Sequence, residues 1–60
     1  MKIPIDEFIR DVKGGLFIDY DGIGNALDKN ENKICPIRCN VNFLRSLAKR
    51  GCVYIEWFNR

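Results

Sequence analysis

The segment from Gly51 to Phe58 constrains the fold of this chain more than any other. β-Branched and aromatic residues dominate it, and such side chains suit a pleated, half-buried strand. Successive side chains of a strand point to opposite faces, so Val53, Ile55 and Trp57 share one face. The other face takes Cys52, Tyr54, Glu56 and Phe58. We predict that this strand is central in a sheet and that the rest of the chain folds onto it.

Length and charge narrow the functions that such a chain can serve. Sixty residues form at most one domain, residues 1–60, with room for one small core and none for a deep cleft. We therefore expect no enzyme activity, no catalytic residues and no cofactor. The net charge of +2 is small for a protein that binds nucleic acid by neutralising phosphates. The short apolar runs predict no membrane span.

The cysteines indicate a reducing compartment. There are three, an odd number, and the chain contains no histidine. A secreted disulfide framework favours an even set, and structural zinc needs four ligands. We expect packed thiols, no bound metal and a cytoplasmic location.

Two segments have the periodicity of amphipathic helices. In Pro4–Lys13, apolar residues recur at the spacing of one helical face, and Gly14 can end the helix. Val41–Arg50 shows the same pattern, and Asn40 or Asn42 can cap its N-terminus.

An Asp-Gly dipeptide predicts a hairpin in the first half of the chain. Leu16–Tyr20 alternates as a strand, and Asp21-Gly22 follows it as a two-residue turn. Ile23–Leu27 would then return alongside, with Leu16 opposite Leu27. This register sorts most apolar side chains to one face.

A further strand, Lys33–Ile37, should lie at a sheet edge, because Pro36 cannot donate a ladder hydrogen bond. The order α-β-β-β-α-β predicts a small two-layer α+β domain, with a mainly antiparallel sheet and both helices on one face. Its predicted core consists of Ile5, Phe8, Ile9, Val12, Leu16, Ile18, Tyr20, Ile23, Leu27, Leu44, Leu47, Val53, Ile55 and Trp57.

The second face of the sheet is the candidate partner-binding site. If the helices cover one face only, Phe17, Tyr54 and Phe58 lie together on the other. Asp19 and Glu56 surround them. Aromatic side chains rimmed by charge are typical of protein interfaces. The alternative is that the strand phase is reversed, or that another segment covers these rings.

Basic residues on or beside the second helix offer a second candidate surface, for nucleic acid. They are Arg38, Arg45, Lys49 and Arg50. Arg45 and Lys49 are four residues apart and so share a side of the helix. The low net charge favours the plainer interpretation, a solvated helix face.

The run from Asp19 to Ala26, followed by Pro36 and a closing Trp57-Phe58-Asn59, resembles a type of short open reading frame of tailed bacteriophages and prophages. Those frames often carry a Tyr-Asp-Gly-aromatic-Gly core and end near Trp-Phe-Asn. Here Ile23 stands in place of the usual aromatic residue. The resemblance implies no catalytic role. It implies a small accessory protein of a phage or mobile element, and such proteins often act by binding a host macromolecule.

We therefore predict a non-enzymatic accessory protein that binds a host or phage protein through the aromatic sheet face, with inhibition of that target as one consequence. A nucleic-acid-binding module that uses the second helix is the alternative. A homodimer, formed through the sheet face or the edge of the last strand, is a third interpretation. The resemblance places the protein in the cytoplasm of a bacterial host cell.

Overall fold

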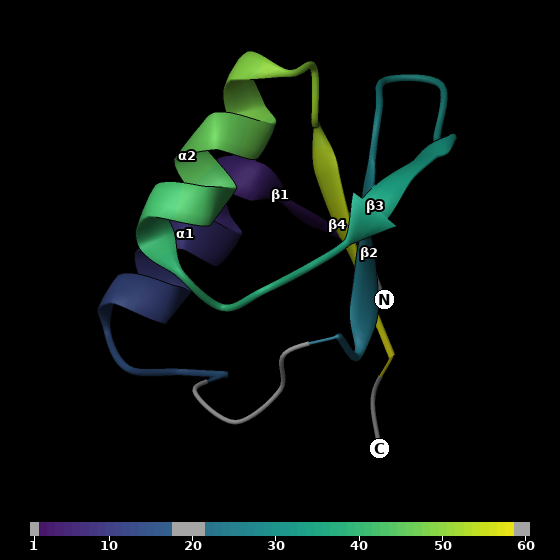
Figure 1. The fold of residues 1–60 in the computed structure, drawn as a ribbon. Coiled ribbons are helices and arrows are strands. Elements are labelled where there is room, and N and C mark those ends of the chain that lie inside the picture. Colours follow the sequence, from purple (N-terminus) through teal and green to yellow (C-terminus); the bar gives the residue numbers. More distant parts are fainter. Residues whose placement is uncertain (1, 18–21, 59–60) are drawn as a thin grey trace.

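The computed structural model describes residues 2–17 and 22–58. Two helices lie on one side of a four-stranded antiparallel sheet, and the order along the chain is β-α-β-β-α-β (Figure 1). The elements are β1 Lys2–Pro4, α1 Ile5–Lys13, β2 Gly24–Leu27, β3 Lys33–Pro36, α2 Val41–Lys49 and β4 Tyr54–Trp57. The predicted class, a small α+β domain, is confirmed.

The N-terminus contributes a strand that the sequence pattern did not predict. β1 pairs antiparallel with β4, and Ile3 lies opposite Ile55. Three residues are too few for alternation to be recognised. Pro4, with φ of −55° and ψ of 140°, ends this strand and caps α1. The helix ends at Gly14, as predicted.

The last strand occupies the interior of the sheet. The strand order is β1-β4-β2-β3, so the predicted central position of β4 is confirmed. Ile55 and Trp57 are buried in the core, which the helices cover. Val53 lies just before the strand and is 37% exposed, so its predicted burial is wrong. Its N–H donates to the Leu27 carbonyl, which holds the backbone there while the side chain stays exposed.

The hairpin predicted around Asp21-Gly22 is wrong in its pairing. Leu16 lies in a turn, and Leu27 pairs with Lys33 on one side and Tyr54 on the other. A strand has two edges, and both edges of β2 are taken by β3 and β4. The predicted partner of β2 therefore has no place beside it. Four residues of the predicted hairpin, Ile18, Asp19, Tyr20 and Asp21, lie outside the described residues.

The connection between β2 and β3 is a turn built on Asp28. Its Oδ1 accepts hydrogen bonds from the backbone N–H groups of Asn30, at 2.8 Å, and Asn32, at 2.9 Å. The Asn32 and Asn30 amides hold the pKa of the Asp28 carboxyl below its ordinary value of 3.8. After this turn β3 runs along the sheet edge, as Pro36 predicts.

This turn makes part of the stability depend on pH. A carboxyl with a lowered pKa stabilises the fold above its unfolded pKa of 3.8, and this contribution is lost as the pH falls through the folded value. Asp28→Asn keeps the acceptor oxygen but does not titrate. From urea denaturation near neutral pH and at about pH 3, we expect the free energy of unfolding to fall further in the wild type than in Asp28→Asn. An equal fall in both proteins would contradict this role.

α2 begins and ends as its flanking residues predict. Asn40, one of the two predicted caps, accepts a hydrogen bond from the Phe43 N–H at 3.1 Å. Gly51 follows the helix with φ of +96°, a left-handed conformation that glycine adopts readily. Leu44 and Leu47 are fully buried, which confirms their place in the predicted core.

The core lies between the sheet and the two helices. Its buried cluster consists of Ile5, Phe8, Ala26, Ile37, Leu44, Leu47, Cys52, Ile55 and Trp57. Three of these were not predicted: Ala26, Ile37 and Cys52. Leu16 is 55% exposed, so its predicted burial is wrong. Ala26 lies opposite Ile55 in β4, so both side chains face the helices. The sequence pattern does not reveal which strands pair, so it did not predict the burial of Ala26.

Candidate functional site

The side of the sheet away from the helices carries the candidate site. Side chains of directly paired residues share a face. Tyr54 lies opposite Pro4 and Leu27, and Glu56 lies opposite Lys2 and Asn25. The Phe58 N–H donates to the Ile23 carbonyl and extends this ladder by one pair. We call this surface the open face; it comprises Lys2, Pro4, Ile23, Asn25, Leu27, Tyr54, Glu56 and Phe58.

Apolar side chains lie at the two ends of the open face, on either side of the row formed by Lys2, Glu56 and Asn25. Phe58 is 48% exposed, and Ile23 and Tyr54 are half-buried. Leu27 is buried but lies outside the core cluster, consistent with its pairing to Tyr54. The structure thus brings Tyr54, Glu56 and Phe58 to one face, as the alternation predicts. Their role in binding stays a prediction.

Phe17 does not lie on the open face. Its ring stacks on that of Phe8, with the centroids 5.0 Å apart. It also packs edge-to-face against Trp57, with the ring centroids 4.7 Å apart. Both partners belong to the core beneath the helices, so the predicted grouping of Phe17 with Tyr54 and Phe58 is wrong. Phe17 has φ of +62°, in a turn, and strand alternation does not apply there. Asp19, the other predicted member from this segment, lies outside the described residues.

Charged groups lie between and beside the apolar side chains of the open face. Lys2 forms an ion pair with Glu31, in the turn between β2 and β3. The hydrogen bond to Glu31 raises the pKa of the Lys2 amine above 10.5, and Glu56 adds to this effect. β4 and β2 lie between β1, which holds Lys2, and the turn that leads into β3. The ion pair between Lys2 and Glu31 therefore reaches across the sheet. Lys2 and Glu56 separate the two apolar ends of the open face, and Glu31 lies in the turn beyond Leu27.

Both sheet edges resist pairing with another chain. Each edge strand begins with a lysine and ends with a proline: Lys2 and Pro4 in β1, Lys33 and Pro36 in β3. Lysine opposes close approach by its charge, and proline lacks the N–H that a new strand would need. A partner is therefore better accommodated on the open face than along an edge.

The basic residues of the alternative site lie on the helical side. Arg45 and Lys49 are exposed on α2, Arg50 caps its C-terminus, and Arg38 lies in the segment that leads into it. Within residues 2–17 and 22–58, none of these four side chains lies within ion-pair distance of a carboxylate.

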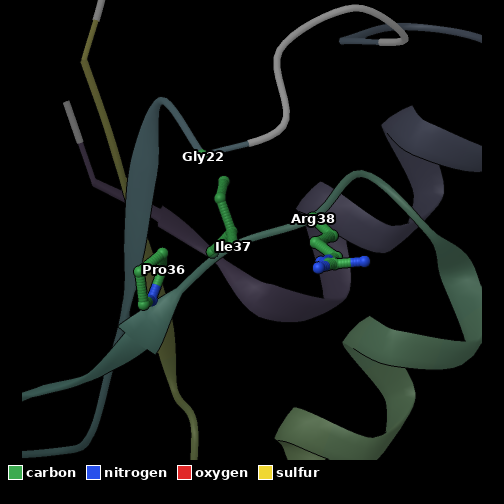
Figure 2. A pocket seen from close by; sticks show the side chains of 4 residues that line it. All are labelled: Gly22, Pro36, Ile37 and Arg38. Atoms are coloured by element: carbon green, nitrogen blue, oxygen red, sulfur yellow. The ribbon is translucent and has the colours of Figure 1, made fainter.

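A shallow hollow of about 480 Å³ lies beside β3 and is lined by Gly22, Pro36, Ile37 and Arg38 (Figure 2). The Gly22 N–H donates to the Ile37 carbonyl at 2.8 Å, and the Ile37 side chain points toward Gly22. Arg38 is the only one of the four with a charged side chain. These four described residues supply no nucleophile and no acid–base pair, so they support no catalytic assignment.

The cysteines pack against the core. Cys35 and Cys39 are half-buried, and Cys52 is buried and donates its S–H to the Tyr54 carbonyl at 3.3 Å. Burial raises the pKa of the Cys52 thiol, which disfavours the thiolate. In the part of the chain that the structure describes, no three His, Cys, Asp or Glu side chains are arranged to hold a metal ion.

Comparisons with protein-family models, with curated proteins and with solved structures found no match to this chain. Among the described residues, neither helix has the length and apolar character needed to cross a membrane.

Proposed function

We propose that this chain is a non-enzymatic binding protein that captures a protein partner on its open face. The observation that carries the proposal is the exposure of Phe58, at 48%, beside Ile23 on the side without helices, with Tyr54 on the same face two rows farther along β4. An exposed apolar patch with a polar rim is typical of interaction surfaces. The lysine and proline residues at both sheet edges favour docking on the face over strand addition.

The open-face residues have different roles in this interface. Tyr54 and Phe58 are the anchors, because large aromatic side chains dominate the binding energy of protein interfaces. Glu56, in the row of Lys2 and Asn25, orients the partner by accepting hydrogen bonds. Phe17 acts indirectly, since its contact with Trp57 supports β4 from the core side.

The resemblance to short phage reading frames supports a partner class. It implies a host or phage protein as the target, which the bound chain would inhibit by covering a surface. Bacterial lysate is therefore the appropriate source in which to seek the partner.

The test is capture from bacterial lysate on the immobilised chain, read by mass spectrometry. We expect Tyr54→Ala with Phe58→Ala to lose the captured protein almost completely, because hot-spot aromatics contribute about 2 kcal/mol or more each. Leu16→Ala with Val53→Ala is the matched control, since it removes two exposed apolar side chains that lie off the open face. Thermal unfolding of each variant verifies that it folds. Capture that survives the Tyr54 and Phe58 changes in a folded variant would refute the proposal.

A second copy of the chain is the competing occupant of the open face. Sedimentation at two protein concentrations distinguishes it. If self-association grows with concentration and is lost in the Tyr54 and Phe58 variant, the open face is a homodimer interface and the proposal of a separate partner fails.

A further inference from the structure

The acidic and basic residues are distributed unequally along the chain. The segment from Lys33 to Ile55 contains five basic residues and no acidic residue. Seven of the eight acidic residues precede it, and only Glu56 follows. The net charge of +2 therefore hides a basic segment whose centre is α2. Such asymmetry suggests an anionic partner.

Helix geometry directs these charges away from the core. At about 100° per residue, Arg45 and Lys49 fall on the side of α2 opposite Leu44 and Leu47, and Arg50 follows at the C-cap. The two leucines are fully buried, so the cations project from the helical layer into solvent. The open face lies on the other side of the sheet (Figure 1). The two surfaces are therefore separate.

The basic residues are not neutralised within the described part of the chain. The ion pair recorded there joins Lys2 to Glu31, and it includes none of the four basic residues on or beside α2. Arg38, Arg45, Lys49 and Arg50 are all exposed. Among the described residues, no carboxylate competes for their charge with an external anion.

We propose that the outer side of α2, with Arg38 and Arg50, binds the phosphate backbone of a nucleic acid. Three of the four cations are arginines, whose planar guanidinium groups bind phosphate oxygens in pairs. The side chains between them, Asn42 and Ser46, are small and polar. An acidic protein would need an apolar anchor there, and a membrane would need an apolar helix face, which α2 buries in the core. Contacts of this kind do not discriminate base sequence.

The salt dependence of DNA binding tests this inference. The probe is a fluorescein-labelled duplex of random sequence, titrated with the whole chain and read by anisotropy. Four phosphate contacts predict a slope of about −3.6 in log affinity against log salt, a loss of roughly 100-fold between about 50 and 200 mM. Affinity that is unchanged over this range, or no binding at the lowest salt, would overturn the inference.

Charge reversal locates the site. We expect Arg45→Glu with Lys49→Glu to weaken DNA binding by at least about tenfold at low salt. Lys13→Glu with Lys29→Glu is the matched control: it changes the net charge equally, and Lys13, like Lys49, lies in the last turn of a helix. A retained affinity in the control and a loss in the α2 variant support the site. Equal losses in both variants would show that net charge alone is responsible and would refute it.

Two further probes examine the class of ligand. Polyglutamate or anionic lipid vesicles that bind as tightly as DNA, at equal anion concentration, would overturn the nucleic-acid assignment. The inference does not rest on the open face. Tyr54→Ala with Phe58→Ala should leave DNA affinity unchanged, so the failure of either proposal can be recognised separately.

Discussion

Gly24→Ala is expected to abolish cooperative folding, or to shift the urea midpoint far below that of the wild type. A Cβ on Gly24 would lie 2.2 Å from the backbone oxygen of Glu56 and 3.2 Å from the Ile37 side chain. β2 cannot move aside, because it is hydrogen-bonded to β3 on one edge and β4 on the other. Overpacking costs about 1–3 kcal/mol even where side chains can adjust, and a backbone oxygen adjusts less. A domain of this size has only about 3–9 kcal/mol of stability.

The matched control is Gly14→Ala at the end of α1. Gly14 has φ of −78°, and a Cβ there would meet the Asp11 carbonyl oxygen at an ordinary 3.5 Å. Alanine at a compatible position stabilises by about 0.4–1 kcal/mol, because the unfolded chain loses freedom. Urea denaturation followed by circular dichroism measures both variants. A Gly24→Ala midpoint equal to that of the wild type would show that β2 and β4 do not approach as described.

Phe8→Ala is the second change with a large expected effect. Phe8 is fully buried, and its ring lies 5.0 Å from Phe17 and 5.9 Å from Trp57. This cluster joins α1, the turn after it and β4. Removing a buried phenylalanine costs about 3–5 kcal/mol, which is between about a third and all of the stability expected here.

Phe58→Ala is the control for this substitution, because it removes the same side chain from a position that is 48% exposed. We expect it to change the free energy of unfolding by less than about 1 kcal/mol. Chemical denaturation monitored by the fluorescence of Trp57, the only tryptophan, reports on both variants. Similar losses in the two variants would contradict the assignment of Phe8 to the core and of Phe58 to the surface.

The spacing of apolar residues and the residues at helix ends predicted the parts of the fold that depend on neighbours in sequence. α1 and α2 follow from apolar spacing and from Gly14, Asn40 and Gly51 at their ends. The period of two placed Ile55 and Trp57 on the buried side of β4. These features require no knowledge of which strands pair.

Strand pairing is where local reasoning failed. Asp21-Gly22 is a strong hairpin signal, but β2 pairs with β3 and β4, which lie farther along the chain. Phe17 lies in a turn with a positive φ, and its ring packs on Phe8. A turn of this kind does not alter the periodicity of apolar residues, so the sequence pattern did not reveal it. One predicted anchor was therefore misplaced, while Tyr54, Glu56 and Phe58 remained together because they belong to a single strand and its extension.

Carbene footprinting of the chain, alone and with the protein captured from bacterial lysate, tests the open face most directly. In the free chain we expect heavy labelling of Phe58, moderate labelling of Tyr54 and Phe17, and little of Trp57, in line with their exposure. With the partner bound, labelling of Phe58 and Tyr54 should fall while the exposed Leu16 keeps its label. Unchanged labelling of Phe58 in the complex, or labelling of Trp57 as heavy as that of Phe58 in the free chain, would contradict a sheet that packs its helices on one side and binds its partner on the other.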